Sequence, residues 1–508
     1  MRLGELLVGR GLVSIATVYA ALEQQRQTGR RLGEILVDMR ALTAEQLADV
    51  TSTLKSGAPK PPRTIADTGI PEAQLTLLLL KLMRYQGRSA TSDIASALRL
   101  PTHVVQDLLS RVSLQKLIQP LGARAMGSLF QDIHYEPTQA GRDLAHEAFE
   151  QNQYMGPAPV PLLSFQGQIA KQTINNEFAG IEDLAPQFEN IILPPRIIRK
   201  ILPAINAGRT VMLYGPPGNG KTIVATRLAN LFNQVIYVPY AVDIGGQIMT
   251  VFDQTLHQPV LSMSEPLLDE QPGTDRGPVA FDERWMPCKR PFCAVGADLD
   301  LSMFELQYDE AAGYYDAPLH VKGLNGSFLI DDFGRQRVSA DAILSRWIMP
   351  MESRMDVLRL HTGKRISLPY DQLLILATNI DPGRLIDPVL SRRIPYKIHM
   401  EGPDEIEYRD LFLQEAAAHG LELSNEVFGL IVRALTIEHP FGLAWFQPKF
   451  LCDQIREVCR SFGIAPVITW ELALEALANL HAGIDGKQTP RPGSVTPPDP
   501  ARISRLAS

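Results

Sequence analysis

Cysteine is scarce in this chain, and the scarcity limits how the protein can be held together. Only four cysteines occur among the 508 residues: Cys288, Cys293, Cys452 and Cys459. Neither pair has the C-x-x-C spacing of a zinc knuckle, so a metal site would require both pairs to converge. The simpler interpretation is four buried thiols in a reducing compartment, without a disulfide framework.

Long apolar runs and a strong excess of charge are also missing. The run Leu77–Leu80 is soon followed by Lys81 and Arg84, far short of the roughly 20 residues that a membrane helix needs. The first residues are amphipathic and do not resemble a secretory signal, so we expect a cytoplasmic protein with no transmembrane segment. A net charge of -7 gives no general attraction to DNA or anionic lipid, so such binding would need a local patch.

A chain of this length exceeds one hydrophobic core and should form several domains. Two segments rich in Pro and Gly, SGAPKPPRT and GPAPVP, are typical of linkers. Before the first linker, the pattern predicts a helical repeat, and between the two linkers it predicts helices with a hairpin. After the second linker, it predicts alternating strands and helices, then helices, and finally a disordered tail rich in Pro, Ser and Gly. The expected boundaries are, in that order, 1–55, 72–150, 180–400, 401–482 and 483–508.

The strongest motif is GPPGNGKT, which follows the apolar strand pattern TVMLY and precedes the helical pattern TIVATRLANLF. It matches G-x-x-x-x-G-K-[ST] in the strand–loop–helix context that phosphate binding requires. Glycines let backbone amides crowd around phosphate oxygens, Lys221 places a cation on the β- and γ-phosphates, and the Thr222 hydroxyl can ligate Mg²⁺. We therefore predict an ATP site formed by Gly215, Pro216, Pro217, Gly218, Asn219, Gly220, Lys221 and Thr222.

Acidic and amide side chains follow two later apolar strands. Asp331 and Asp332 come directly after the strand 328–330, where Asp331 should hold Mg²⁺ and Asp332 should orient the attacking water. Asn379 ends the strand pattern LLILATN, and its neutral amide can position that water beside the γ-phosphate. Both roles are catalytic contributions to phosphoryl transfer.

Two arginines, Arg392 and Arg393, stand just before the strand pattern YKIHM. A guanidinium here is placed to reach the phosphates of a neighbouring subunit and to neutralise charge in the transition state. The sequence does not distinguish which of the two would act.

This order of motifs resembles the AAA+ ATPase superfamily, and the stretch from AILSRW to ATN resembles its MoxR-like members. The resemblance implies an α/β P-loop AAA+ core, with a parallel sheet between helices, and a helical lid. It also implies ATP and Mg²⁺ as cofactors, and a homo-oligomeric, hexameric ring that hydrolyses ATP between subunits. Two features depart from the family: Asp332 stands where a longer Glu is usual, and only Lys449 lies near the usual lid arginine.

The segment between Tyr240 and the strand before Asp331 is unusually long and rich in aromatic residues. Its aromatics could line the central pore of a ring, or they could form the small core of an insertion, which we favour.

The N-terminal repeat resembles the N-terminal domain of type II secretion and type IV pilus ATPases, a family that binds cyclic di-GMP. RLGELLVGRGLV and RLGEILVDMRAL each begin one unit, and the second departs from the family pattern at Arg40, Ala41, Thr51 and Leu54. An arginine can stack on guanine and pair with phosphate, while the glycine allows close approach of the backbone. The resemblance implies a cyclic di-GMP site with Arg2, Leu3, Gly4, Gln25, Arg31, Leu32 and Gly33; a docking domain without the ligand is the alternative.

Residues 72–150 resemble a winged-helix domain, with PTHVVQDLLSRV as the recognition helix. Arg111, Lys116 and Arg124 form a thin basic patch, so DNA and a protein partner are both open.

Two functions follow from these motifs. The first is a remodelling or assembly ATPase that acts on an unidentified protein client and is regulated by its N-terminal domains. The alternative is a nucleotide-dependent switch or transcriptional regulator that binds DNA through the winged helix. A secretion motor is suggested by the repeat alone, and the AAA+ order of the core argues against it.

Overall fold

A computed structural model of the chain describes residues 13–14, 17–18, 20–21, 24, 32–43, 57–124, 132–188, 191, 193–260, 281–438 and 442–481. The chain forms two compact units, each described by itself below. The first contains Met1–Glu189, Pro194–Tyr214 and Thr222–Ile398, and the second contains Asn190–Leu193, Gly215–Lys221 and His399–Ser508.

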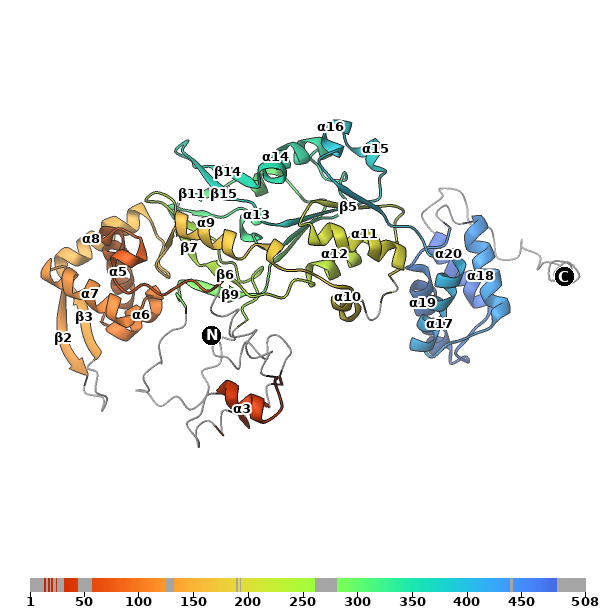
Figure 1. Cartoon of the computed structure of the whole chain (residues 1–508), viewed down its shortest axis with the longest axis horizontal. Helices are drawn as coiled ribbons and strands as arrows, with labels where there is room; N and C mark the ends of the chain where they lie inside the picture. Colours follow the sequence, from red (N-terminus) through yellow and green to blue (C-terminus); the bar gives the residue numbers. More distant parts are fainter. Residues whose placement is uncertain are drawn as a thin grey trace, which may run out of the picture. The chain divides into compact units, whose positions relative to one another are not determined.

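The central element of the first unit is a five-stranded sheet with the order β10-β13-β16-β5-β17. Its strand β5 is labelled in Figure 1. β10 pairs with β13, β13 with β16, and β16 with β5, and all three pairs are parallel. Each residue of β13 and β16 is buried, as expected for apolar strands covered on both faces. The bounds are Phe292–Val295 for β10, Ser327–Ile330 for β13, Leu373–Thr378 for β16, Val211–Tyr214 for β5 and Tyr396–His399 for β17.

Helices accompany this sheet along the chain, as the alternating pattern predicts. α11 precedes β5 and α12 follows it, and Figure 1 shows both helices beside β5. An antiparallel hairpin of β14 and β15 lies between α14 and β16 in sequence. The bounds are Ile181–Gln187 for α10, Pro195–Asn206 for α11, Lys221–Ala229 for α12, Ala340–Ser353 for α14, Met355–Arg359 for β14, Arg365–Pro369 for β15, Pro382–Leu385 for α15 and Pro388–Ser391 for α16.

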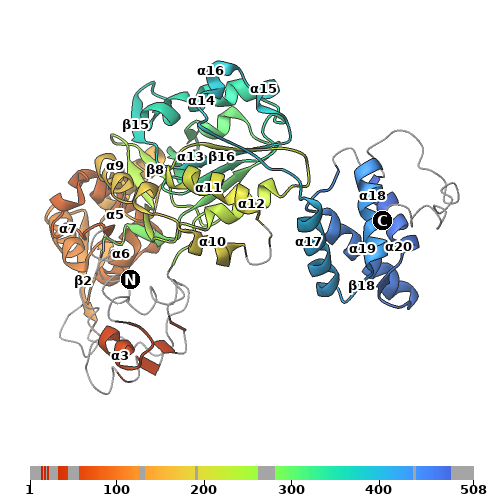
Figure 2. The same cartoon turned by 45° about the vertical axis from the view of Figure 1, so that its right-hand side comes forward.

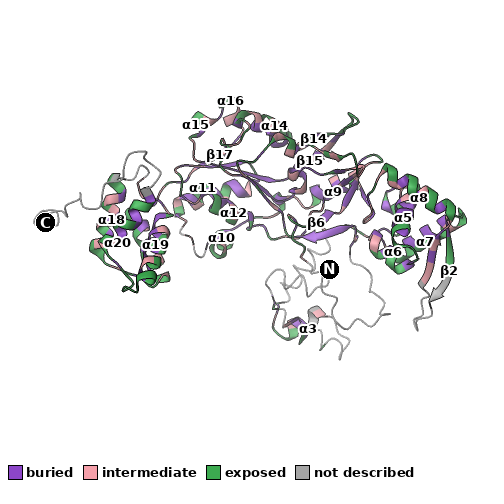
Figure 3. Ribbon diagram, turned by 180° about the vertical axis from the view of Figure 1, so that it is seen from behind, coloured by how far each residue is buried: buried purple, intermediate pink, exposed green. Residues whose placement is uncertain are grey.

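Segments before and after Tyr240 form a second sheet, with the order β11-β12-β8-β7-β4, and an antiparallel pair of β6 with β9. Every residue of β6 and β9 is buried, and Figure 3 shows β6 in the colour of buried residues. Three aromatics of the segment after Tyr240, Trp285, Phe304 and Tyr315, are at most 3% exposed and belong to the main core cluster. They share this core with the central sheet, for example with Phe328 of β13, and do not form a separate core of the insertion. The bounds are Val160–Pro161 for β4, Leu162–Lys171 for α9, Ile236–Pro239 for β6, Ala241–Asp243 for β7, Ile248–Thr250 for β8, Trp285–Cys288 for β9, Gln307–Asp309 for β11, Tyr314–Asp316 for β12 and Leu319–Lys322 for α13.

Residues 72–151 form helices around an antiparallel sheet with the order β1-β3-β2. Apolar residues at helical spacing, such as Leu75, Leu79 and Leu108, are fully buried there. The bounds are Glu72–Gln86 for α5, Ser89–Ala90 for β1, Thr91–Leu98 for α6, Thr102–Leu114 for α7, Ile118–Arg124 for β2, Asp132–Pro137 for β3 and Gln139–Gln151 for α8.

The described residues of the second unit from 399 to 481 form the helices α17, α18, α19 and α20, which share one core and lie together in Figure 2. α17 begins with a capping box, in which Asp404 and Glu407 satisfy each other's backbone amides. The core includes two cysteines, and all four cysteines of the chain are buried free thiols, as predicted. The bounds are Glu405–Ala418 for α17, Asn425–Glu438 for α18, Gln447–Phe462 for α19 and Trp470–His481 for α20; a short pair joins Glu422–Leu423 (β18) to Val467–Ile468 (β19).

The two predicted linkers are packed rather than extended between separate bodies. β4, at the end of GPAPVP, pairs with β7, and the amide of Asp282 donates to Pro59 O at 2.8 Å. Beside them lies a buried ion pair: Arg284 bonds both oxygens of Asp282 and also donates to Thr68 O and Pro159 O. Proline leaves its carbonyl free to accept, so these segments can satisfy a buried guanidinium.

Across the described residues, no helix combines the length and the apolar character that crossing a bilayer requires.

Replacing Asp282 by Asn should destabilise the first unit by about 3–5 kcal/mol, because Arg284 would remain buried without its counter-charge. Urea unfolding followed by tryptophan fluorescence measures this, since Trp285 and Trp347 lie in the same core. The control is Glu72→Gln, which removes a partner of Arg111 from an exposed ion pair and should cost less than about 1 kcal/mol. An equal loss of unfolding free energy in the two variants would contradict a stabilising role for the buried Asp282–Arg284 ion pair.

Candidate functional site

The glycine loop 215–221 connects β5 to α12 and adopts conformations that side chains resist. Gly215, Gly218 and Gly220 have φ of 142°, 79° and 70°. The Lys221 ammonium group turns back over this loop, donating to Gly215 O at 3.0 Å and Pro216 O at 2.7 Å. The loop thus folds around the ammonium group of its own lysine. Phosphate oxygens can bind at such a place, where backbone amides and a cation meet.

Packing within the second unit fixes the loop. Asn219 is 3% exposed and donates its side-chain amide to Met400 O at 3.1 Å. A Cβ on Gly215 would lie 2.6 Å from that same carbonyl oxygen, and one on Gly218 would lie 2.2 Å from Phe446 Cδ1. The glycines are therefore required by space as well as by φ.

Thr222, the second residue of α12, contacts the acidic end of β13. Its hydroxyl lies 2.8 Å from Asp331 Oδ2 and 3.1 Å from Oδ1. The two residues are 109 positions apart in sequence, and the parallel strands bring them together at one edge of the sheet. A hydroxyl and a carboxylate at this spacing are hard oxygen ligands, which Mg²⁺ prefers.

Asp332 and Asn379 also meet, as two strand ends do in a parallel sheet. Asn379 Nδ2 donates to Asp332 Oδ1 at 3.1 Å. Asp332 has φ of 47°, a left-handed conformation that is uncommon for a non-glycine residue and turns the chain immediately after β13. The link between Thr378 Oγ1 and Phe333 O, at 2.7 Å, fixes this turn to the end of β16.

Gln336 supports the acidic turn, and the sequence contained no signal for it. Its side-chain amide donates to Asp331 O at 2.9 Å and Asp332 O at 3.2 Å, while its oxygen accepts from Gly334 N at 2.7 Å. Glutamine is common in loops, and its role depends on a turn that only the folded chain defines. Gln336 is a positioning residue for the two aspartates.

The oxygens of Thr222 and Asp331 fit Mg²⁺ as part of its coordination shell. No cluster of three or more His, Cys, Asp or Glu side chains that could hold a metal occurs in the described ranges. Thr222 and Asp331 would supply only part of a coordination shell, which suits Mg²⁺, an ion that retains waters and shares phosphate oxygens.

The predicted arginines lie elsewhere in the first unit. Arg393 forms an ion pair with Glu352 of α14, and Arg392 is exposed after α16. Both line a cavity whose lining includes none of Thr222, Asp331, Asp332 or Asn379. Lys449, the weak candidate of the lid, is exposed on α19.

The predicted cyclic di-GMP residues are mostly outside the described residues: Arg2, Leu3, Gly4, Gln25 and Arg31. Leu32 and Gly33 begin the helix α3, which spans Leu32–Asp38.

The class of this chain is defined by the succession of a strand, a glycine loop and a helix, together with acidic residues at the end of a parallel strand of the same sheet. It has an α/β P-loop fold, with a parallel sheet flanked by helices and followed in sequence by a helical region. The predicted fold class is confirmed.

Comparison with known proteins adds three findings. Residues 404–479 match a family described as "Domain of unknown function (DUF8689)". No curated protein matches the chain. Among solved structures, a RuvB point mutant from Thermotoga maritima is 13% identical, with a TM-score of 0.33, covering 58% of this chain and 73% of that one. NtrX from Brucella abortus is 11% identical, with a TM-score of 0.36, covering 68% and 64%.

Substituting alanine for Gly215 should lower the melting temperature and weaken nucleotide binding, because its Cβ would overlap the Met400 carbonyl. The matched variant is Gly220→Ala, whose φ is also positive but whose Cβ would meet nothing within 4 Å. Differential scanning calorimetry and binding of a fluorescent ATP analogue compare the two. The steric account fails if Gly220→Ala is the more damaging change.

Proposed function

We propose that this chain binds and hydrolyses ATP with Mg²⁺ and acts in the cytoplasm as an AAA+ remodelling or assembly ATPase. The observation that supports it best is the contact between the Thr222 hydroxyl and the Asp331 carboxylate at 2.8 Å. Lys221 and Thr222 are consecutive residues of α12, so a phosphate bound by the lysine places its oxygens next to this pair of hard ligands.

Binding would use the glycine loop. The backbone amides of the loop and the first turn of α12 would donate to the β- and γ-phosphates. Lys221 would exchange its bonds to Gly215 O and Pro216 O for bonds to phosphate oxygens. Thr222 and Asp331 would hold magnesium, which neutralises phosphate charge when it is bound.

Hydrolysis would use the second acid and the amide. Asp332 would accept a hydrogen bond from the water that attacks the γ-phosphate in line, and Asn379 would hold the Asp332 carboxylate in place. Aspartate reaches one methylene less far than the usual glutamate. The left-handed turn at Asp332 alters the direction of that carboxylate, and we expect slow turnover with ordinary ATP affinity.

We further propose a homo-oligomeric ring, a hexamer by resemblance, in which Arg392 or Arg393 reaches the nucleotide of the next subunit. The separation of both arginines from the acids of their own chain supports action between subunits. The client would be a protein, and its identity is open.

The DNA-binding alternative receives less support from the helix on which it depends. Arg111 is the only basic residue within α7 apart from His103, and its guanidinium bonds both Asp107 and Glu72 at 3.1 Å. These carboxylates raise the pKa of Arg111 and offset its charge, with the bond to Asp107 as the largest cause. An arginine whose positive charge is offset by two carboxylates contributes little to phosphate binding, so we favour a protein contact for this domain.

Lys221→Ala should abolish ATP binding and turnover together, because the phosphates lose their cation. Asp332→Asn should retain ATP binding within about threefold and lower kcat by 100-fold or more, because the water loses its base. Phosphate release and binding of a fluorescent ATP analogue measure both effects.

Lys200→Ala is the control, because it removes an exposed lysine from the neighbouring helix α11. Its rate and affinity should equal those of the parent. If Lys221→Ala hydrolysed ATP at the parental rate, the proposed function would be rejected.

Cyclic di-GMP as the regulator is a separate proposal that rests on the N-terminal sequence pattern. Adding it should change the ATPase rate and the particle size, measured by light scattering, in the parent but not in Arg2→Ala/Arg31→Ala. An unchanged rate and size, with no binding by calorimetry, would remove this role and leave the ATPase proposal standing.

A further inference from the structure

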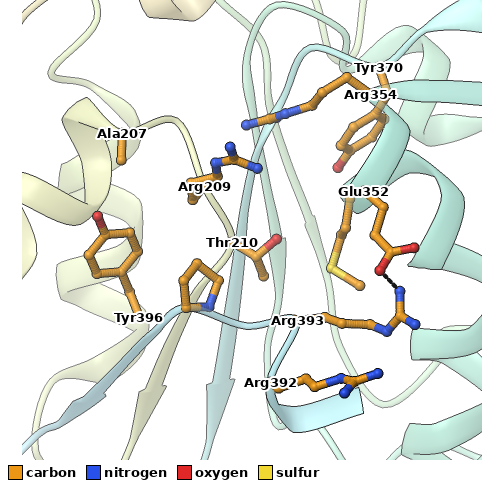
Figure 4. A pocket seen from close by; sticks show the side chains of 11 residues that line it. Ala207, Arg209, Thr210, Glu352, Arg354, Tyr370, Arg392, Arg393 and Tyr396 are labelled. Carbon is orange, nitrogen blue, oxygen red and sulfur yellow. Dashed lines mark ion pairs between the residues drawn. The ribbon is translucent and has the colours of Figure 1, made fainter. Parts of the chain in front are cut away.

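The first unit contains a cavity of about 660 Å³ whose lining includes Arg392 and Arg393 but none of Thr222, Asp331, Asp332 and Asn379. Its walls come from the turn between α11 and β5, the end of α14, Tyr370 after β15, and the segment that leads into β17 (Figure 4). The turn precedes β5, whereas the glycine loop follows it. The cavity therefore lies at the edge of the sheet opposite to the edge that carries Asp331 and Asp332.

Positive charge dominates this cavity. Four arginines line it, Arg209, Arg354, Arg392 and Arg393, against one acid, Glu352, so the lining carries 4 − 1 = 3 positive charges. Glu352 pairs with Arg393, and the other three guanidinium groups have no carboxylate among the lining residues. A volume of this size is typical of small-molecule sites.

Two of these like charges are held close together. Figure 4 shows the side chains of Arg209 and Arg354 extending toward one another across the cavity. Burial lowers the pKa of Arg354, and the charge of Arg209 lowers it further. Arg354 nevertheless stays in place, because it ends α14 in a left-handed conformation with φ of 55° and donates Nη2 to Gly208 O. An anion between the two guanidinium groups would relieve this repulsion.

Two residues of the lining also carry unused donors. Among the described residues, Arg393 Nε and the Tyr370 hydroxyl are buried without a hydrogen-bond partner. Burial raises the pKa of Tyr370 well above its usual value, so its hydroxyl remains protonated and able to donate. Buried donors of this kind are rare in folded proteins and mark places where a ligand can complete the bonding.

We propose that this cavity binds a free polyphosphate anion, such as pyrophosphate, within a single chain. Guanidinium groups match phosphate oxygens through paired hydrogen bonds, and several arginines can share one polyphosphate. All of the lining residues belong to the first unit, so binding there does not require the glycine loop or a second subunit.

Calorimetry with pyrophosphate and full-length Lys221→Ala, in EDTA, tests this directly, because that background removes the cation of the glycine loop. We expect one site that weakens as salt increases. Arg209→Gln should lower the affinity by about tenfold or more through the loss of charge-assisted bonds, and Arg209 is exposed, so the fold should survive. Glu352→Gln should raise the affinity, because it removes the only negative charge of the lining.

Arg199→Gln is the matched control: it removes the same charge from an exposed position on α11, outside the lining, and should bind like its background. Absence of binding at millimolar pyrophosphate, or equal binding by the Arg209 and Arg199 variants, would overturn the proposal. So would a loss of ATP turnover in Arg209→Gln without any pyrophosphate binding, since the cavity would then serve a neighbouring subunit. The calorimetric results are independent of whether the parent hydrolyses ATP.

Discussion

The parallel register of β13, β16 and β5 is the constraint on which the candidate site depends. Because their carboxyl ends share one edge, Asp331 lies against the Thr222 hydroxyl, and Asp332 lies against Asn379. A shift of one residue in any pair would reverse the faces of the strands and separate these oxygens. The apolar strands, buried on both faces, are therefore as necessary to the chemistry as the polar residues that follow them.

The insertion supports this sheet through buried polar contacts as well as aromatic packing. Arg346 and His320 both bond Asp356 beneath the aromatic cluster around Trp347. His320 and Arg346 lower the pKa of Asp356 despite its burial, so it remains charged. Such groups are costly to bury unless each is satisfied, and here they tie α13, α14 and β14 together. The insertion thereby positions α14, whose last residues line the cavity that also contains Arg209, Arg392 and Arg393.

Charge is distributed unevenly over the first unit. Aspartates collect where β13 ends, and arginines collect where β5 and β17 begin. This separation gives one sheet two edges of opposite character, the first suited to a magnesium-bound phosphate and the second to a bare anion. The small net charge of the whole chain conceals both.

Local patterns in the sequence were sufficient for the P-loop fold class, because strand periodicity and the steric demands of phosphate binding act over a few residues. They were also sufficient for the helical character of the last region. The clamp by Gln336, the packed linkers around Arg284 and the meeting of Arg209 with Arg354 were decided only by tertiary structure. The Gln336 contacts depend on a turn that only the folded chain defines, and the other two join segments far apart in the chain. Residue type alone does not say which distant partner a guanidinium will meet.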